Sequence, residues 1–213
     1  MVQEVVVTVT ALPNSPPAAG EAAVPTEPIY RLSVQQYRAM AQHGTLHEDD
    51  PVELLEGWLV QKMTKRPPHS IATGLVRDAL DRVLPAGWHT DVQEPISTAE
   101  SEPEPDVAVI RGARRDYLKA PPAHPNVALV VEVADTSLRQ DRGTKKRIYA
   151  RAGLPTYWII NLIQRHIEVY TSPSGPAPGP NYGERHVYEL ADAVPVILDG
   201  VEVARLEVRD LLP

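Results

Sequence analysis

The sequence predicts an α/β fold in which a mixed β-sheet is flanked by helices and extended by extra strands at the C-terminal end. Residues 126–133, NVALVVEV, are almost continuously apolar, which is typical of a strand buried on both faces of a covered sheet. Segments with helical and strand periodicity alternate along the chain. The final segment, VPVILDGVEVARLEV, contains Asp199-Gly200, a strong hairpin signal.

Length and composition indicate one folded domain behind an N-terminal tail. The chain has 213 residues, enough for a single domain with a sizeable core. Residues 1–28 are rich in Pro, Ala and Glu without a sustained period, so we expect a disordered tail there. Residues 29–213 are expected to form the single folded domain.

The first half of this domain is expected to contain two helices separated by a strand pair. Ser33 suits the N-cap of a helix that ends at Gly44. VELLEGWLV forms two short strands around the turn Glu56-Gly57. Pro67-Pro68 is expected to break the chain before a helix over about residues 69–84, in which apolar residues recur every four positions.

The second half is expected to be mainly strands. WHTDVQEPI, PDVAVI and NVALVVEV precede a helix over about residues 141–152, which Gly153 stops. TYWIINL and HIEVYT then form a strand pair, followed by RHVYEL and the C-terminal hairpin. Tyr157 and Trp158 are expected to pack in the core or at an edge. His166 and His186 lie in polar strand patterns and are expected at the surface.

Composition limits the chemistry and the partners. The chain has no cysteine, which excludes disulfides, thiolate metal sites and a cysteine nucleophile, and fits a reducing cytoplasm. No apolar run has the length of a membrane span. The net charge of −7 speaks against a protein that holds duplex DNA mainly by neutralising phosphates. Any binding of nucleic acid must therefore use a local patch.

Glu132 is the most informative single residue. It interrupts an apolar strand, where a carboxylate is costly unless it is paired or bound to a cation. It also lies near the C-terminal end of that strand, where ligand sites of open α/β sheets gather. The alternatives are a carboxylate at the solvent edge of the strand end, or one paired with a nearby arginine.

Asp106 and Lys145 are candidates to join Glu132. Asp106 starts the preceding predicted strand, so its carboxylate and that of Glu132 are expected within reach of one cation. Lys145 shares a helical face with Ile148, Tyr149 and Ala152, and that apolar face is expected to point inward. An inward lysine needs an anionic partner, for which Glu132 is the natural candidate. Alternatively, Pro105-Asp106 marks only a turn, and Lys145 snorkels to solvent.

Glu53 and Glu56 flank Leu54-Leu55 and offer one further acid. Strand alternation places the two glutamates on opposite faces, so only one of them is expected to join a site. The alternative is a pair of exposed acids beside a turn.

An ordered set of segments gives the sequence a specific resemblance. VELLEGWLV, His69, PEPDVAVIRG, LVVEVADTSLRQDRGTKKRIYARAGLPTYWIINL and HIEVY together resemble the Uma2 family of restriction-endonuclease-like proteins, part of the broader PD-(D/E)XK nuclease group. The resemblance runs from about Tyr30 to the end of the chain. It implies a restriction-endonuclease-like mixed sheet flanked by helices.

The resemblance also implies a set of site residues. The motif acids fall on Asp106 and Glu132, and the family's early glutamate falls on Glu53 rather than Glu56. The third motif position of the broader group is Ala134 here, but Uma2-like sequences carry the lysine on the next helix, at Lys145.

His69 matches a recurrent position in the family without an assigned role, and packing or capping at the helix start is an equal alternative.

The chemistry implied is metal-dependent hydrolysis of phosphodiester bonds in nucleic acid, with DNA preferred over RNA. Asp106, Glu132 and the Val133 carbonyl would hold Mg²⁺ or Mn²⁺ through hard oxygen ligands. Lys145 would orient or deprotonate the attacking water and offset negative charge, and Glu53 would complete the outer shell.

Two other functions stay open at this point. One is an inactive nuclease-fold protein that binds nucleic acid or a protein partner, and the other is an interaction module whose acids merely bind a cation. A homodimer is also compatible with the sequence, because nucleases that cut both strands often pair.

Overall fold

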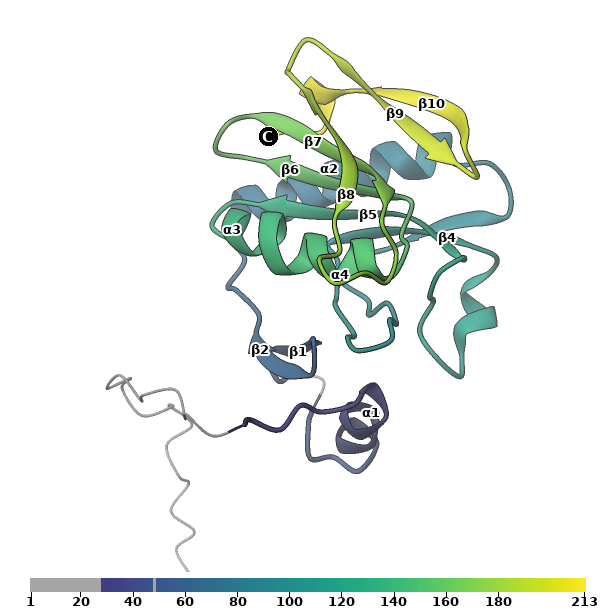
Figure 1. Ribbon diagram of the computed structural model, residues 1–213. Helices are drawn as coiled ribbons and strands as arrows, with labels where there is room; N and C mark the ends of the chain where they lie inside the picture. Colours follow the sequence, from purple (N-terminus) through teal and green to yellow (C-terminus); the bar gives the residue numbers. More distant parts are fainter. Residues whose placement is uncertain (1–27, 48) are drawn as a thin grey trace, which may run out of the picture. The chain divides into compact units, whose positions relative to one another are not determined.

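The computed structural model describes residues 28–47 and 49–213, and all its helices and strands lie in one compact unit, Arg31–Pro213. The tail expected over residues 1–28 lies, except for its last residue, outside the described residues. The α/β fold with a mixed sheet, flanking helices and extra C-terminal strands is confirmed (Figure 1).

A six-stranded sheet forms the centre of the unit, in the order β3-β4-β5-β6-β7-β8. Only β5 and β6 run parallel, and every other neighbouring pair is antiparallel. Parallel strands need a long crossover, which the helical segment after β5 supplies. The bounds of the strands are β3 Trp88–Asp91, β4 Val107–Arg111, β5 Val127–Ala134, β6 Thr156–Asn161, β7 His166–Pro173 and β8 Tyr182–Tyr188.

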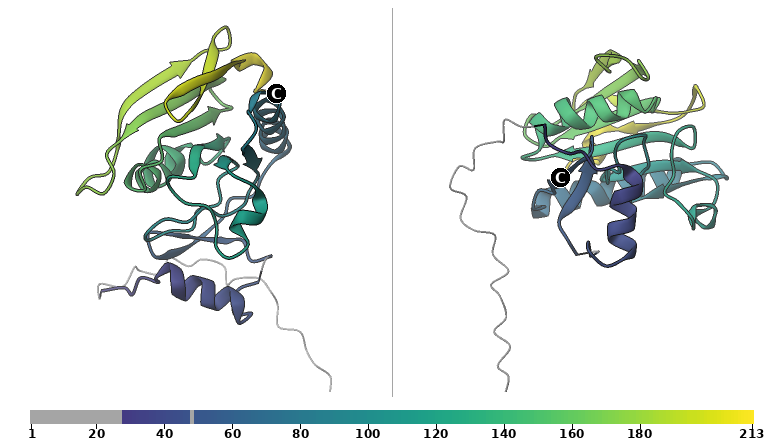
Figure 2. Two further views of the ribbon diagram at one scale, coloured as in Figure 1. Left: turned by 90° about the vertical axis from the view of Figure 1, so that its right-hand side faces the viewer. Right: turned by 60° about the horizontal axis from the view of Figure 1, so that its bottom comes forward.

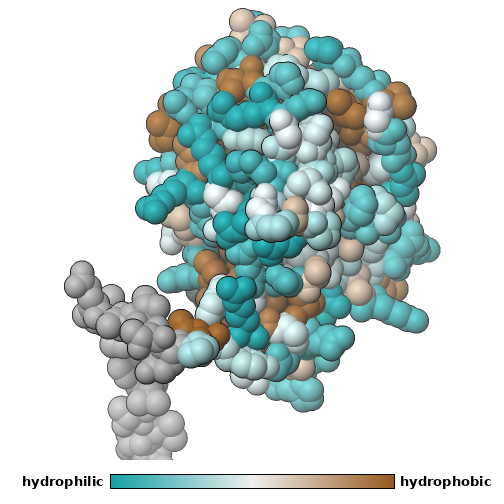
Figure 3. Space-filling model, in the orientation of Figure 1, coloured by the Kyte–Doolittle hydropathy of each residue, from teal (hydrophilic) through white to brown (hydrophobic). Residues whose placement is uncertain are grey.

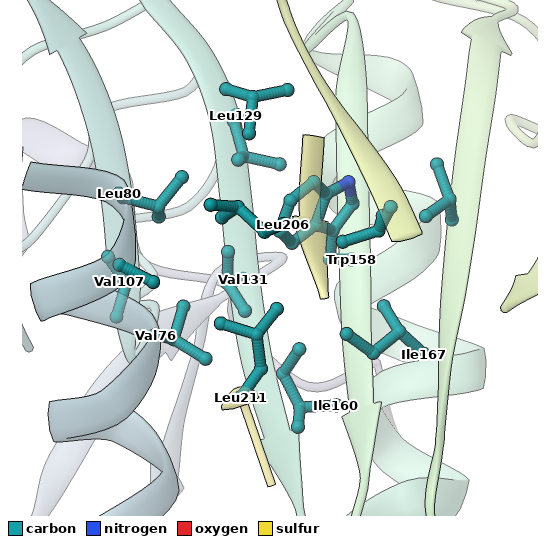
Figure 4. Packing of buried hydrophobic residues seen from close by; sticks show 14 of the residues in the cluster. Val76, Leu80, Val107, Leu129, Val131, Trp158, Ile160, Ile167, Leu206 and Leu211 are labelled. Atoms are coloured by element: carbon teal, nitrogen blue, oxygen red, sulfur yellow. The ribbon is translucent and has the colours of Figure 1, made fainter. Parts of the chain in front are cut away.

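Different elements cover the two faces of the sheet (Figures 1 and 2). One face packs against helix α2 (Pro67–Val83) and the hairpin of β9 (Ala193–Leu198) and β10 (Val201–Glu207). Figure 4 shows Val76 and Leu80 of α2 on one side of Val131 in this layer, with Leu206 and Trp158 on the other side. The other face packs against a helical segment made of α3 (Leu138–Gln140), η2 (Asp141–Lys145) and α4 (Lys146–Arg151).

The burial of the central strands on both faces explains why the sheet lies between two covering layers. All eight residues of β5 are buried, as expected for a strand covered on both sides. Tyr157 and Trp158, adjacent on β6, are fully buried on opposite faces, which confirms their packing in the core. The central strands therefore form two apolar layers, and a polar side chain within them must find a partner.

Two short hairpins confirm the turns that the sequence indicates. Glu56 and Gly57, between β1 (Val52–Leu55) and β2 (Trp58–Gln61), have φ of 50° and 83°. Asp199 and Gly200, between β9 and β10, have φ of 52° and 78°. Positive φ at both central residues is the pattern of a type I′ turn, whose twist suits antiparallel strands.

The first helix also follows the expectation. Helix α1 (Val34–Gln42) begins after Ser33, whose hydroxyl accepts the Gln36 N–H while the Gln36 side chain accepts the Ser33 N–H. This capping box satisfies two of the amide groups that a helix start leaves free. Gly44, just after the helix, has a φ of 70°.

Three expectations about elements were wrong. Pro67 and Pro68 do not break the chain before the second helix, because they occupy its first positions, where a missing N–H costs nothing. The strand expected over WHTDVQEPI ends at Asp91. The helix expected from Asp141 begins at Leu138 and contains a π-helical turn, η2.

The surface and the helices can be compared in hydropathy. The face seen in Figure 3 is mostly hydrophilic, with apolar side chains in separate small patches. Within the part of the chain that the structure describes, every helix is too short or too polar to cross a membrane.

Candidate functional site

A polar cavity lies at the C-terminal end of β5 and collects nearly all the candidate residues. We call it the acid cavity. Its walls come from β1, the β2–α2 linker, the start of α2, the approach to β4, the end of β5 and η2. Its buried ionisable residues are Glu53, His69, Asp106, Glu132, Asp141 and Lys145. Residues far apart in the sequence therefore converge on one place.

Asp106 lies one residue before β4 and faces the end of β5. Its Oδ2 atom accepts the Val133 N–H at 2.8 Å and lies 3.0 Å from His69 Nε2. The N–H and C=O groups of one strand residue lie on the same side, so the Val133 carbonyl also points toward Asp106. Two contacts hold Oδ2, whereas Oδ1 has no hydrogen-bond partner within the part of the chain that the structure describes.

Lys145 joins two of the acids at the bottom of the cavity. Its Nζ lies 2.7 Å from Glu53 Oε2 and 3.2 Å from Glu132 Oε1. The Tyr149 hydroxyl also donates to Glu132, and the Glu104 N–H donates to Glu53 at 3.1 Å. Lys145 is buried, so it does not snorkel to solvent.

Of the two early glutamates, only Glu53 lies at the cavity. Glu56 lies in the turn and binds Arg147 and Arg151 instead. Successive side chains of a strand point to opposite faces, so Glu53 on β1 faces the cavity while Glu56 in the turn does not.

The helical segment after β5 determines where Lys145 points. The π-helical turn η2 inserts an extra residue into the helix, and such turns are common at functional sites. Lys145 and Tyr149 still lie one turn apart and both reach Glu132. The next residue, Lys146, lies over the Tyr170 ring, 5.3 Å from its centroid, and does not line the cavity.

Asp141 is a cavity residue that sequence reasoning missed. It is buried, its Oδ2 accepts the Ser137 hydroxyl at 2.6 Å, and its backbone carbonyl accepts the Tyr157 hydroxyl at 3.2 Å. Its position four residues before Lys145 was the available signal, because helical residues four apart share a face. The sequence predicts a helix that begins at about Asp141, and the start of a helix does not by itself indicate a buried site residue.

His69 begins the inward face of α2 and contacts Asp106 directly. Its Nε2 lies 3.0 Å from Asp106 Oδ2, and the Thr73 hydroxyl donates to the His69 carbonyl at 3.0 Å. Only 9% of His69 is exposed, which places the ring inside the cavity wall rather than at the helix surface.

Burial and crowding of like charges shift the acids away from their ordinary behaviour. Burial raises the pKa of Glu132 well above its usual range, and the charges of Asp106, Asp141 and Glu53 add to this effect against that of Lys145. Burial likewise raises the pKa of Asp141 to about 6 despite its bond from Ser137. Burial lowers the pKa of Lys145, but Glu132 and Glu53 outweigh it, so the amine is held protonated.

The donor set of the acid cavity suits a hard divalent cation. Within residues 28–47 and 49–213, no three His, Asp or Glu side chains are arranged as a complete metal-binding group. Mg²⁺ commonly binds through one or two carboxylates and keeps several waters, so a complete protein cage is not required. Asp106, Glu132 and the Val133 carbonyl supply such oxygens beside one another, and the residues present therefore fit the ion.

A second buried carboxylate lies on the same face of the sheet but outside the cavity. Glu168 of β7 is fully buried and binds Arg142, Arg185 and Tyr170, which together we call the Glu168 cluster. His166 Nε2 lies 3.4 Å from Glu168 Oε1, and His166 is 8% exposed. The expectation of a surface position for His166 was wrong, because the buried acid draws the ring inward.

His186 is exposed on β8, as expected.

Comparisons with known proteins show what this chain is similar to in fold and in family. The structure is similar to the crystal structure of a "putative nuclease belonging to DUF820" from Anabaena variabilis ATCC 29413, with a TM-score of 0.63 and 18% sequence identity. The similarity covers 84% of this chain and 97% of that chain. It shows that the two proteins share a nuclease fold. No curated protein matches this chain.

The family follows from the sequence match. The Uma2 family, described as "Putative restriction endonuclease", matches residues 34–207. The chain belongs to the Uma2 family, which confirms the resemblance seen in the sequence.

Proposed function

We propose that the protein is a metal-dependent endonuclease that hydrolyses phosphodiester bonds in nucleic acid at the acid cavity. The observation that carries this proposal is the contact of one buried amine, Lys145, with Glu53 and Glu132, beside Asp106 from the neighbouring strand approach. Membership of the Uma2 family and the shared nuclease fold support the same reaction class.

Each residue has a distinct role in the proposed site. Asp106, Glu132 and the Val133 carbonyl would hold Mg²⁺ or Mn²⁺. Such an ion, when bound, polarises a phosphoryl oxygen and lowers the pKa of a bound water. His69 and the Val133 N–H hold one oxygen of Asp106 and so direct its other oxygen.

Lys145 and Glu53 act on the reacting groups rather than on the fold alone. The Lys145 ammonium places positive charge at the base of the cavity, where it offsets charge that develops on the phosphoryl group and orients the attacking water. Glu53 fixes the position of Lys145 through the 2.7 Å contact. In the overall reaction a water oxygen bonds to phosphorus, the ester P–O bond breaks, and the leaving oxygen gains a proton.

The substrate and setting complete the proposal. DNA is the expected substrate, in line with the description of the family as restriction endonucleases. A cytoplasmic setting fits the absence of cysteine. A homodimer is also part of the proposal, and light scattering of the purified chain tests it.

Metal binding and cleavage of the Asp106→Asn variant test the site. Asn keeps the size of the side chain and removes its charge, so the variant is expected to lose Mn²⁺ binding in calorimetry and cleavage of labelled DNA. Asp78→Asn, on the exposed side of α2, is the matched control and keeps both. Unchanged binding in Asp106→Asn overturns the site.

Cleavage that persists in EDTA, or metal binding without any cleavage, overturns the proposed reaction. The second outcome favours an inactive nuclease-fold protein that binds nucleic acid.

A further inference from the structure

A continuous groove crosses the mouth of the acid cavity. Two shallower depressions adjoin the cavity, one beside β2 and the linker to α2, the other beside α3 and the start of α4. All three share Met63 and Thr136 in their walls. We call the joined depressions the strand groove. Met63, which is 47% exposed, lies where the two arms meet the cavity.

The strand groove carries unpaired positive charge at the cavity and in the arm beside α3. Its other cations are neutralised, since Lys62 pairs with Glu104 at 2.6 Å and Arg66 with Asp135 at 2.6 Å. Lys65 and Arg139 are exposed, and neither makes an ion pair or hydrogen bond within the described part of the chain. These two side chains are therefore available to an external anion.

From this arrangement we propose that the strand groove binds a single strand of nucleic acid. Lys65, at the cavity, and Arg139, in the arm beside α3, would hold backbone phosphates next to the one that enters the cavity. The inference rests on the proposed function, which it deepens by naming the form of the substrate. It also accounts for how a chain of net charge −7 holds a polyanion, since the contact is short and local.

The depth of the cavity favours a single strand over a duplex. Glu53, Asp106 and Glu132 are each about 95% buried. The cavity at their carboxylates has a volume of about 80 Å³, comparable to a few waters at ~30 Å³ each. A phosphate group fits such a space, but its strand must bend inward to deliver it. A single strand bends freely, whereas a paired one must first deform.

The lining favours contacts to the backbone rather than to the bases. Among the residues that the structure describes, no Phe, Tyr or Trp lines any of the three depressions, so these residues offer no stacking of bases there. Duplex binders commonly use about six to ten phosphate contacts, and two unpaired cations do not supply that number. We therefore expect binding that tolerates different sequences and prefers unpaired strands.

Binding of a labelled single-stranded DNA oligonucleotide and of its annealed duplex, measured by fluorescence anisotropy in EDTA, tests the proposal. EDTA prevents metal-dependent cleavage, so affinity is measured separately from the reaction. We expect the wild type to bind the single strand more tightly than the duplex. The double variant Lys65→Gln/Arg139→Gln should lose about tenfold or more in single-strand affinity, and its salt slope should fall by about 1.4.

Arg115→Gln/Lys119→Gln is the matched control. Both residues are exposed cations without an ion pair among the described residues, and they lie away from the groove. This variant loses the same net charge and should stay within about twofold of wild type. The proposal is wrong if the two double variants lose single-strand affinity equally, or if Lys65→Gln/Arg139→Gln loses none. It is also wrong if the wild type binds the duplex more tightly than the single strand.

The two proposals fail separately in this experiment. Groove-dependent binding of single strands by a protein that never cleaves leaves the groove standing and removes the nuclease reaction. Metal-dependent cleavage with full affinity in Lys65→Gln/Arg139→Gln removes the groove and leaves the cavity as the reaction centre.

Discussion

Glu132 and Glu168 occupy equivalent places in the sheet and have opposite surroundings. Glu132 on β5 is paired in register with Ile159 on β6, which is paired in turn with Glu168 on β7. The two acids therefore lie in one row across three strands, under the same helical segment, and both are buried. The sheet position alone does not decide what a buried carboxylate does.

The cations that approach the two acids differ in burial and in number. Glu132 has one buried amine, Lys145, which it shares with Glu53. Glu168 has two guanidinium groups to itself, from Arg142 and Arg185, and both are partly exposed.

The pKa values of the two acids move in opposite directions as a result. Burial raises the pKa of Glu132 despite Lys145, whereas at Glu168 burial is outweighed by the bonds from Arg142, Tyr170 and Arg185, which lower its pKa to about 2. Glu168, whose charge is fully paired, joins η2 and β8 to β7 through Arg142 and Arg185. The under-compensated acid, Glu132, faces a cavity, where we propose that it binds a further cation.

The largest expected effect is on catalysis at Lys145. Lys145→Gln removes the only buried cation in contact with Glu132 among the described residues, and we expect a fall in kcat of about 100- to 1,000-fold. The adjacent Lys146→Gln is the matched control, because Lys146 contacts Tyr170 outside the cavity. Single-turnover cleavage of labelled DNA, with folding checked by circular dichroism, measures both.

Arg142→Gln tests the other side of the comparison. It removes a cation from the Glu168 cluster and should reduce thermal stability while leaving cleavage within a few-fold of wild type. If Arg142→Gln and Lys145→Gln reduce cleavage equally, the division between a structural and a reactive acid is wrong.

Stability at neutral pH should depend strongly on Glu168. A pKa lowered from 4.5 to about 2 corresponds to about 3 kcal/mol of stabilisation by the ionised form. We expect Glu168→Gln to reduce the free energy of unfolding by up to about that amount, measured by urea denaturation at pH 7. Glu184→Gln, an exposed acid on β8, is the control and should change stability by under about 0.5 kcal/mol.

The pH dependence gives an independent measure of the same acid. The folded-state pKa of Glu168 lies below its ordinary value, so its stabilisation is complete above pH 4.5 and is lost as the pH falls toward 2. Arg142 and Arg185 stay charged in this range, and Tyr170 stays neutral. His166, 3.4 Å away, is the remaining titratable neighbour.

Between pH 4.5 and 2, wild type should therefore lose about 3 kcal/mol more stability than Glu168→Gln. If the unfolding free energies of wild type and Glu168→Gln changed in parallel with pH, the contacts from Arg142 and Arg185 would not lower the pKa of Glu168 in solution.

The spacing of apolar residues predicted the strands and the inward face of the helical segment that contains η2, because buried positions recur at regular intervals along a strand or helix. It thereby brought Asp106, Glu132 and Lys145 together, and the structure places all three at one cavity. It did not predict Asp141 as a cavity residue, because the expected helix began there, although its position four residues before Lys145 indicates a shared face. Nor did it predict the burial of His166, which depends on partners from three separate elements that form the Glu168 cluster.

A moderate effect is expected at His69. His69→Phe keeps a ring in the cavity wall and removes the contact to Asp106, so Mn²⁺ affinity in calorimetry should fall by about tenfold. His69→Gln retains a donor and should recover most of the affinity. A loss of thermal stability in His69→Phe without any change in affinity would assign His69 to packing alone.

The smallest effects should come from the two tyrosines that donate to the acids. Tyr149 donates to Glu132, and Tyr170 donates to Glu168 at 2.6 Å. Each substitution by Phe removes one hydrogen bond to a buried carboxyl group, and we expect a loss of about 1 kcal/mol in unfolding free energy for either. Stability alone therefore does not separate the two sites.

Metal affinity does separate them. Tyr149→Phe leaves Glu132 with Lys145 as its only remaining donor in the described structure, so Mn²⁺ affinity should change severalfold. Tyr170→Phe leaves two guanidinium groups on Glu168 and should leave that affinity unchanged. Calorimetry on both variants beside wild type decides the matter. If Mn²⁺ affinity changed equally in the two variants, the row of residues from Glu132 through Ile159 to Glu168 would have to couple the two acids. The proposal that only Glu132 belongs to the metal site would then be wrong.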